Sequence, residues 1–250
     1  MIPIKTEQEL KVMREGGKIL ARILEDLKNK IRAGISTYEL DEYASQLMSA
    51  YKVLSAFKNY KGFPANICTS VNAEVVHGIP RKDLLLKEGD IISIDVGIIY
   101  RGFYLDSALT LPVGKIDKDK QRLIEVTKNA LYQGIKKAKA GNFLSDISYT
   151  IQSYVESEGF SVVREFVGHG IGRMMHEEPQ IPNFGKPHQG PLLREGMVLA
   201  IEPMVNMGTW EVEILDNRWT AVTKDRLPSA HFEHTVAVRE QKPEILTLLS

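Results

Sequence analysis

The chain has 250 residues, 43% of them hydrophobic, and its 32 basic side chains balance its 32 acidic ones, which predicts a globular fold with a substantial core. Zero net charge disfavours binding to nucleic acid through phosphates, and the single cysteine excludes a disulfide framework or a cysteine-based zinc site. Because no apolar stretch could span a membrane and the first residues lack a secretory pattern, we expect a soluble cytoplasmic protein without membrane contact.

Apolar residues that recur at three- and four-residue spacing predict four helices. They cover about 7–30, a stretch that begins after Ser36 or Thr37, about 118–139 and about 144–158. Thr6 and Glu9 form a capping-box pattern at the start of the first helix, and Gly159 ends the fourth.

Apolar runs predict strands in two regions of the chain. Residues 90–96 and 103–111 are separated by a short segment ending at Gly102, a spacing typical of a β-hairpin. Further strands are expected over 197–202, around Trp210 and Trp219, and over 232–239.

Three short strings occur in the same order in both halves of the chain. Residues 85–95 match residues 192–202 at an offset of 107, and an Ala-Gly pair before the second helix recurs before the fourth. The string His77-Gly-Ile also recurs at His169. A duplicated α+β unit explains this order better than chance similarity does.

We therefore predict a single domain over residues 1–250, with halves at roughly 31–110 and 138–240. Two such halves facing each other would place equivalent strand-end residues beside a shared central cleft.

Four acidic residues interrupt otherwise apolar strand sequence. Asp95 ends the first strand of the predicted hairpin, Asp106 lies on the second, and Glu202 and Glu233 lie in later strands. One such acid would normally form a salt bridge or face solvent, because an unpaired buried charge is costly. Four converging acids need a compensating cation, and carboxylates with a histidine have the composition of a metal site.

The histidines supply further candidates. His169 lies between glycines, which let a backbone approach a ligand closely. His176 follows seven residues later, where the glycines favour a loop over a helix. We interpret His188 as structural and His234 as structural or as a neighbour of the ligands.

Together, these strings resemble the signature of type I methionine aminopeptidases. The resemblance rests on the stretch from Phe166 to Pro179, His77-Gly-Ile-Pro, Asp95-Val-Gly, Asp106-Ser-Ala, Ile201-Glu-Pro-Met and Phe232-Glu-His-Thr. It extends from the first helix to about Arg239. It implies the pseudosymmetric, duplicated pita-bread fold of the α+β class, an antiparallel curved sheet with helices on its outer face.

The resemblance implies a dinuclear metal site. Asp95 would bind one metal, His169 and Glu202 would lie beside the other, and Asp106 and Glu233 would bridge them. The cofactors would be two divalent ions, and such ligands accept Co, Mn, Fe or Zn.

The resemblance also implies how a substrate would be handled. Glu202 would accept a proton from the attacking water, His176 would hydrogen-bond the carbonyl oxygen, and His77 would lie near the scissile nitrogen. A methionine side chain would bind among Tyr60, Phe63, Met175 and Trp219, whose alternative interpretation is as core residues.

The implied activity is removal of the initiator methionine from nascent polypeptides whose second residue is small. Nascent N-termini would be the substrate, the ribosome is a candidate partner, and we expect a monomer. Alternatives on the same fold are an X-Pro-type aminopeptidase and a non-catalytic binding protein. All five expected ligands are present, which disfavours the binding protein.

Several residues depart from the family pattern. Leu105 replaces a small residue, Phe57 replaces a frequently smaller residue near the pocket, and His231 replaces glutamine. Because His231 precedes Glu233 by two positions, both should point to one face of a strand. We expect His231 to lie beside the ligands, for example hydrogen-bonded to a ligating carboxylate, rather than to bind a metal as a sixth ligand. Cys68 is interpreted as a small buried residue.

Overall fold

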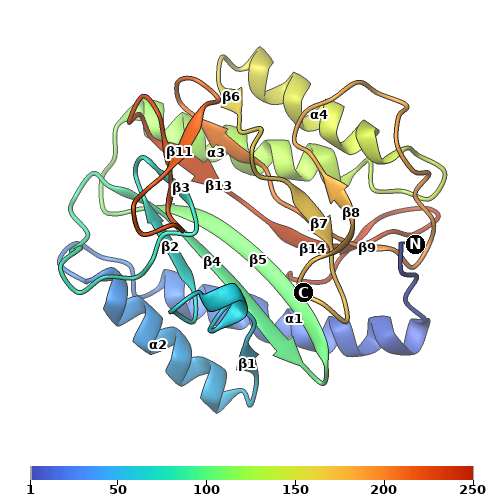
Figure 1. Ribbon diagram of the computed structural model, residues 1–250, viewed down its shortest axis with the longest axis horizontal. Helices are drawn as coiled ribbons and strands as arrows, with labels where there is room; N and C mark the ends of the chain where they lie inside the picture. Colours follow the sequence, from blue (N-terminus) through green and yellow to red (C-terminus); the bar gives the residue numbers. More distant parts are fainter. Residues whose placement is uncertain (1, 250) are drawn as a thin grey trace.

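Over residues 2–249, which the computed structural model describes, the chain forms four α-helices and fifteen strands (Figure 1). The helices are α1 (Glu7–Lys28), α2 (Thr37–Ala50), α3 (Lys118–Ile135) and α4 (Leu144–Ser157). A 3₁₀ turn, η1, covers Tyr60–Gly62. The four predicted helices are confirmed, with ends that differ by a few residues.

Capping boxes fix the starts of the first two helices. The Thr6 side chain accepts a hydrogen bond from the Glu9 backbone N–H, and the Glu9 carboxylate accepts one from the Thr6 N–H. Ser36 and Glu39 repeat this arrangement at the start of α2. Each box satisfies two backbone donors that a helix N-terminus would leave free.

The third helix is shorter than predicted, because it ends at Ile135 rather than near 139. The Ala140 N–H donates to the Arg239 carbonyl at 3.0 Å, and Lys139 forms a β-bridge with Arg239. The backbone after Ile135 is therefore paired with the chain near residue 239 instead of continuing the helix.

All strand pairs among the described residues are antiparallel and form four sheets. The first, β1–β4–β2 with β5 beside β4, contains β1 (Leu54–Ser55), β2 (Cys68–Val71), β4 (Ile91–Tyr100) and β5 (Phe103–Pro112). The second, β13–β10–β6, contains β6 (Ser161–Val162), β10 (Met204–Asn206) and β13 (Ser229–His231). The third, β11–β12–β3, contains β3 (Glu74–Val76), β11 (Val212–Ile214) and β12 (Ala221–Thr223). The fourth, β15–β14–β9–β7–β8, contains β7 (Gly168–Gly170), β8 (Glu177–Ile181), β9 (Val198–Ile201), β14 (His234–Ala237) and β15 (Glu244–Ile245).

The predicted hairpin is confirmed as β4 and β5, the long ribbons that cross the middle of the molecule in Figure 1. Arg101 and Gly102 both have positive φ, +47° and +78°, as the tight turn of a two-residue hairpin requires. The prediction that Asp95 ends its strand is wrong. β4 continues to Tyr100, because residues 96–100 remain paired with β5.

The predicted strand over 232–239 is interrupted. β13 ends at His231 and β14 begins at His234, so Phe232 and Glu233 lie between two strands of different sheets. Strands β11 and β12 follow Trp210 and Trp219, as expected for that region.

Three hydrophobic clusters form the core, and the smallest packs β3 against β10 and β12. The two large clusters lie in different halves of the fold. One packs α1 and α2 against β2 and β4, and the other packs α3 and α4 against β9 and β14. The β-bridge between Ser36 and Leu85 recurs 107 residues later between Phe143 and Leu192, the offset seen in the sequence. In Figure 1 the helices lie outside the strands, α1 and α2 on one side and α3 and α4 on the other. Within residues 2–249, no helix has both the length and the hydropathy that crossing a bilayer requires.

Candidate metal centre and active site

A cavity of about 240 Å³ is lined by residues from both halves of the chain. Every residue predicted for the site lines it: Asp95, Asp106, His169, Glu202, Glu233, His77, His176, Tyr60, Phe63, Met175 and Trp219. Phe57, Lys61 and Cys68 complete the lining. Lys61 was missed because a lysine in a turn carries no sequence signal for a site.

Strand register brings three of the acids together. Ala108 of β5 pairs with Asp95 of β4 on one side and exchanges two backbone hydrogen bonds with Glu233 on the other, at 2.9 and 3.3 Å. Directly paired residues point to the same face of a sheet, as do residues two apart on one strand. Asp95, Asp106 and Glu233 therefore share one face across three adjacent segments.

The Thr235 side chain fixes Asp106 further. Its hydroxyl accepts from the Asp106 N–H at 3.0 Å and donates to the Asp106 carbonyl at 2.7 Å. Because Thr235 belongs to β14, this pair of hydrogen bonds joins the hairpin of the first half to the second half.

His169 approaches these acids from β7. Its Nδ1 lies 2.9 Å from the Gly170 carbonyl oxygen, to which an Nδ1–H donates, and its Nε2 lies 3.5 Å from a Glu202 carboxylate oxygen. A ring nitrogen that donates to a backbone carbonyl leaves the other nitrogen free as a metal ligand. Glu202 follows directly after β9, whose Ala200 pairs with His169.

The loop expected between His169 and His176 is present over residues 171–176, but His169 itself lies in β7, a strand paired with both β8 and β9. A Cβ atom at Gly168 would overlap the Ala200 carbonyl oxygen, and one at Gly170 would overlap the Glu178 carbonyl oxygen. The flanking glycines thus permit close approach of neighbouring strands.

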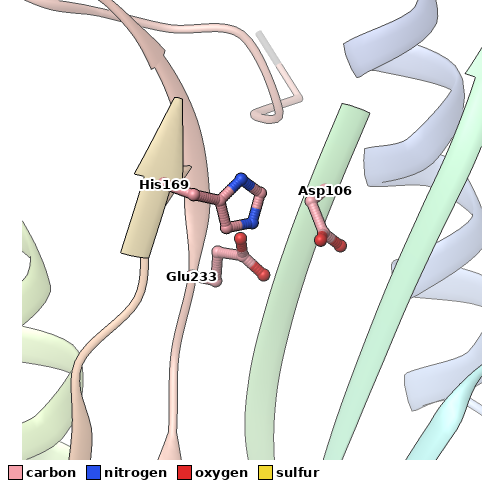
Figure 2. A group of neighbouring side chains, drawn as sticks. All are labelled: Asp106, His169 and Glu233. Carbon is pink, nitrogen blue, oxygen red and sulfur yellow. The ribbon is translucent and has the colours of Figure 1, made fainter. Parts of the chain in front are cut away.

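Figure 2 shows the His169 ring and the carboxylates of Glu233 and Asp106 pointing toward one another. One potential ligand atom from each of these three buried residues lies within 4.8 Å of the other two. This spacing allows one small cation to contact all three side chains.

Burial makes the negative charges of this cluster costly. It raises the pKa of Asp95, Glu202 and Glu233 well above the ordinary range of carboxyl groups, and repulsion from neighbouring acids raises these pKa values further. Burial also raises the pKa of Asp106 to about 7. Burial lowers the pKa of His169 to about 3, which keeps its imidazole neutral.

The cluster fits divalent cations. Asp95 Oδ1 and Glu233 Oε1 are buried and have no hydrogen-bond partner among the described residues. Buried hydrogen-bond acceptors normally have partners. A cation would coordinate these oxygens and neutralise the carboxyl groups whose pKa values are raised. Carboxylates and neutral imidazole form a donor set that suits first-row transition metals.

The remaining residues form a partly apolar wall. Tyr60 Oη lies 2.8 Å from His176 Nδ1 in a hydrogen bond, and the rings of Phe63 and Trp219 meet edge to face with centroids 5.1 Å apart. His77 adopts a left-handed backbone conformation with φ of +59°, and burial lowers its pKa to about 4. Non-glycine residues with such φ values concentrate at functional sites.

The residues that depart from the family pattern have different surroundings. Leu105 is buried beside Gly16 of α1 and does not line the cavity, whereas Phe57 does. Cys68 is buried, as predicted, and also lines the cavity.

The two remaining histidine predictions have different outcomes. His231 Nε2 lies 3.6 Å from a carboxylate oxygen of Glu202, so it stands beside an expected ligand without forming a hydrogen bond to it. His234 is structural, because its ring bonds the hydroxyls of Thr247 and Tyr132 at 2.9 and 3.3 Å.

Comparison with known proteins identifies the family. The model of metallopeptidase family M24 matches residues 11–240. The chain is 53% identical to methionine aminopeptidase 1 of Bacillus subtilis over 99% of both chains, and 52% identical to methionine aminopeptidase of Clostridium perfringens over 100% of both. The crystal structure of a methionine aminopeptidase from Thermotoga maritima superposes with a TM-score of 0.98, at 46% identity over the whole of both chains.

More distant structures share the architecture. A prolidase from Pyrococcus furiosus covers 99% of this chain with a TM-score of 0.79, and 66% of that prolidase is covered in turn. At 20% identity this likeness shows the fold alone, which is the predicted pita-bread fold. With its buried cluster of acids and histidine, its duplicated fold and a family match over nearly its whole length, the chain belongs to metallopeptidase family M24 and uses divalent metal.

Proposed function

We propose that the protein is a methionine aminopeptidase of type I, which removes the N-terminal methionine from polypeptides whose second residue is small. The observation that carries this proposal is the cavity in which five predicted ligands meet an aromatic and apolar wall. Relatives that carry the name methionine aminopeptidase are about half identical to it over 99–100% of its length.

We infer that the cavity holds two divalent ions. Asp95 would hold one ion and His169 and Glu202 the other, with Asp106 and Glu233 shared between them. Co, Mn, Fe and Zn all suit this donor set. When bound, such ions supply Lewis acidity to the scissile carbonyl and lower the pKa of the attacking water.

The side chains of the cavity orient the reaction. Glu202 accepts a proton from the attacking water. His176, fixed by Tyr60, donates a hydrogen bond to the carbonyl oxygen as negative charge develops there. His77, held neutral by burial, lies near the scissile nitrogen.

The wall of the cavity selects the first residue of the substrate. Tyr60, Phe63, Met175 and Trp219 line the same cavity as the predicted ligands. Their apolar surfaces suit an unbranched thioether side chain, which packs well against aromatic edges.

The proposed substrates are nascent polypeptides, which implies action in the cytoplasm close to the ribosome. We propose that the protein acts there as a monomer, with residues 1–250 forming one catalytic domain. Its halves cover roughly 31–110 and 138–240, and neither half alone supplies all five ligands.

Hydrolysis of Met-Ala-Ser and Ala-Pro-Ser by the same preparation tests the proposal. After treatment with a chelator and addition of Mn or Co, we expect release of methionine from the first peptide only. Cleavage of Ala-Pro-Ser alone would indicate an X-Pro-type aminopeptidase. Absence of cleavage in protein that binds the metals would indicate a binding function instead.

A further inference from the structure

The segment before α1 carries a buried charge. Lys5 lies just ahead of the capping residue Thr6, yet its side chain is only 4% exposed. Its Nζ lies 2.5 Å from Oε2 of Glu177, whose side chain is 3% exposed. Desolvation of such a pair usually offsets most of its attraction, so the pair by itself is weak evidence of added stability.

Glu177 also binds the loop that precedes it. Its Oε1 accepts hydrogen bonds from the backbone N–H groups of Arg173 and Met174, at 2.6 and 3.2 Å. One carboxylate thus holds Lys5 with one oxygen and the loop over residues 171–176 with the other. Hydrogen bonds to a charged acceptor are shorter and stronger than neutral ones.

Lys5 is itself fixed against this loop. Its N–H donates to the Gly196 carbonyl at 2.8 Å, and a Cβ atom at Gly172 would overlap the end of the Lys5 side chain. The loop backbone at Gly172 therefore packs directly on the lysine. On its outer side, Arg173 pairs with Glu9 of α1 at 3.0 Å.

The same loop supplies two residues that line the active-site cavity. Met175 is 3% exposed and lines the cavity next to His176, which is hydrogen-bonded to Tyr60. The contacts of Lys5 and Glu177 act on residues two to four positions before His176.

We propose that Lys5 and Glu177 are positioning residues that hold loop 171–176, and with it Met175 and His176, in the conformation that binds substrate. This inference rests on the proposed function, because it assumes that both loop residues contact the substrate. Neither positioning residue lines the cavity, so both act through the loop backbone. Displacement of a catalytic group by about 1 Å can cost roughly a hundredfold in rate, so a small movement would suffice.

Two single variants and two matched controls test the proposal. Lys5→Met removes the cation and Glu177→Gln removes the anion, whereas Lys11→Met and Glu178→Gln make the same changes at exposed neighbouring positions. Amide hydrogen exchange over residues 171–176, bound metal, the melting temperature and the kinetics of Met-Ala-Ser hydrolysis are measured on each.

We expect both variants to retain the metal content of the controls, to exchange loop amides faster, and to lose kcat/KM by up to about a hundredfold. A purely structural role would lower the melting temperature and leave kcat unchanged below the transition. Loop exchange and kinetics equal to those of the controls would overturn the proposal.

A double variant covers the case in which a single variant fails to fold. Lys5→Met with Glu177→Leu removes both buried charges, which commonly restores stability, but leaves the Arg173 and Met174 amides without their acceptor. We expect restored melting with continued loss of kcat, and full activity would refute the proposal. If the unaltered protein does not cleave Met-Ala-Ser, the proposed function fails, while loop exchange still tests the positioning of the loop.

Discussion

Removal of the divalent ions should make the stability of the protein fall as the pH rises above neutrality. In the metal-free protein, burial raises the pKa of Asp106 from 3.8 to about 7, and burial and repulsion raise the pKa values of Asp95, Glu202 and Glu233. A carboxyl group with a raised pKa binds more protons in the native state than in the unfolded chain. Its contribution to stability is therefore complete below the unfolded pKa and is lost as the pH rises through the folded pKa.

The size of this stability change follows from the pKa shifts, because a shift of one pKa unit between the folded and unfolded states corresponds to about 1.4 kcal/mol. For Asp106 the whole shift corresponds to about 4 kcal/mol, spread over roughly pH 4 to 7. Of this, about 1 kcal/mol falls between pH 8 and 6.5, and protons bound by Asp95, Glu202 and Glu233, whose pKa values are also raised, add to it.

The buried histidines limit this gain at lower pH. Burial lowers the pKa of His169 and His231 to about 3, and that of His77 and His234 to about 4. A histidine with a lowered pKa contributes stability that is present above its unfolded pKa of 6.5 and is lost as the pH falls toward the folded pKa. The rise in stability should therefore stop near pH 6.5.

Urea unfolding of chelator-treated protein between about pH 5 and 8 measures this profile. We expect the free energy of unfolding to increase from pH 8 to 6.5 and then to level off. Saturation with Mn or Co should reverse the slope above neutrality, because metal binding requires deprotonated ligands. Metal-free stability that is constant or increases from pH 6.5 to 8 would refute the assignment of raised pKa values to this cluster.

Three substitutions give further predictions. Glu202→Gln should fold normally but lose about a hundred- to thousandfold in turnover of Met-Ala-Ser at saturating metal, and near-normal turnover would remove Glu202 from the mechanism. His231→Gln should keep two bound metals in calorimetric titration and substantial turnover of Met-Ala-Ser, because the His231 ring makes no hydrogen bond to a ligand carboxylate, whereas loss of a whole metal equivalent would identify His231 as a ligand. Gly170→Ala should destabilise the protein by about 1–3 kcal/mol in thermal melting, because its Cβ would overlap the Glu178 carbonyl, and unchanged melting would contradict the close strand packing.

Much of the site was predictable because its key residues are acids within apolar strands, where burying a charged side chain costs free energy. An acid in an apolar strand, such as Asp95 or Asp106, requires a partner wherever it is buried. The repeat also indicated that both halves contribute to one cleft. The helices were predictable for a similar reason, since apolar spacing and caps such as Thr6 with Glu9 are local signals.

Pairing between strands or side chains that are far apart in the chain could not be predicted from the sequence. Apolar content alone could not show that β4 continues past Asp95, or that the strand predicted over 232–239 is interrupted at Glu233. The glycines beside His169 were consistent with either a loop or closely packed strands, and only the neighbouring carbonyl groups distinguish these possibilities. Lys5 and Glu177 are 172 residues apart and gave no sequence signal of a buried pair.

The pairing of Ala108 with both Asp95 and Glu233 explains how like charges are held together without an ion. Each acid is fixed through backbone hydrogen bonds, which do not depend on the protonation state of its side chain. Separating the carboxylates would require breaking the contacts that join the central hairpin to the second half, including those between Asp106 and Thr235. The repulsion is therefore relieved by proton uptake or by cation binding rather than by movement of the strands. This rigidity preorganises the ligands. A cation can therefore interact with their negative charges without a large reorganisation of the backbone.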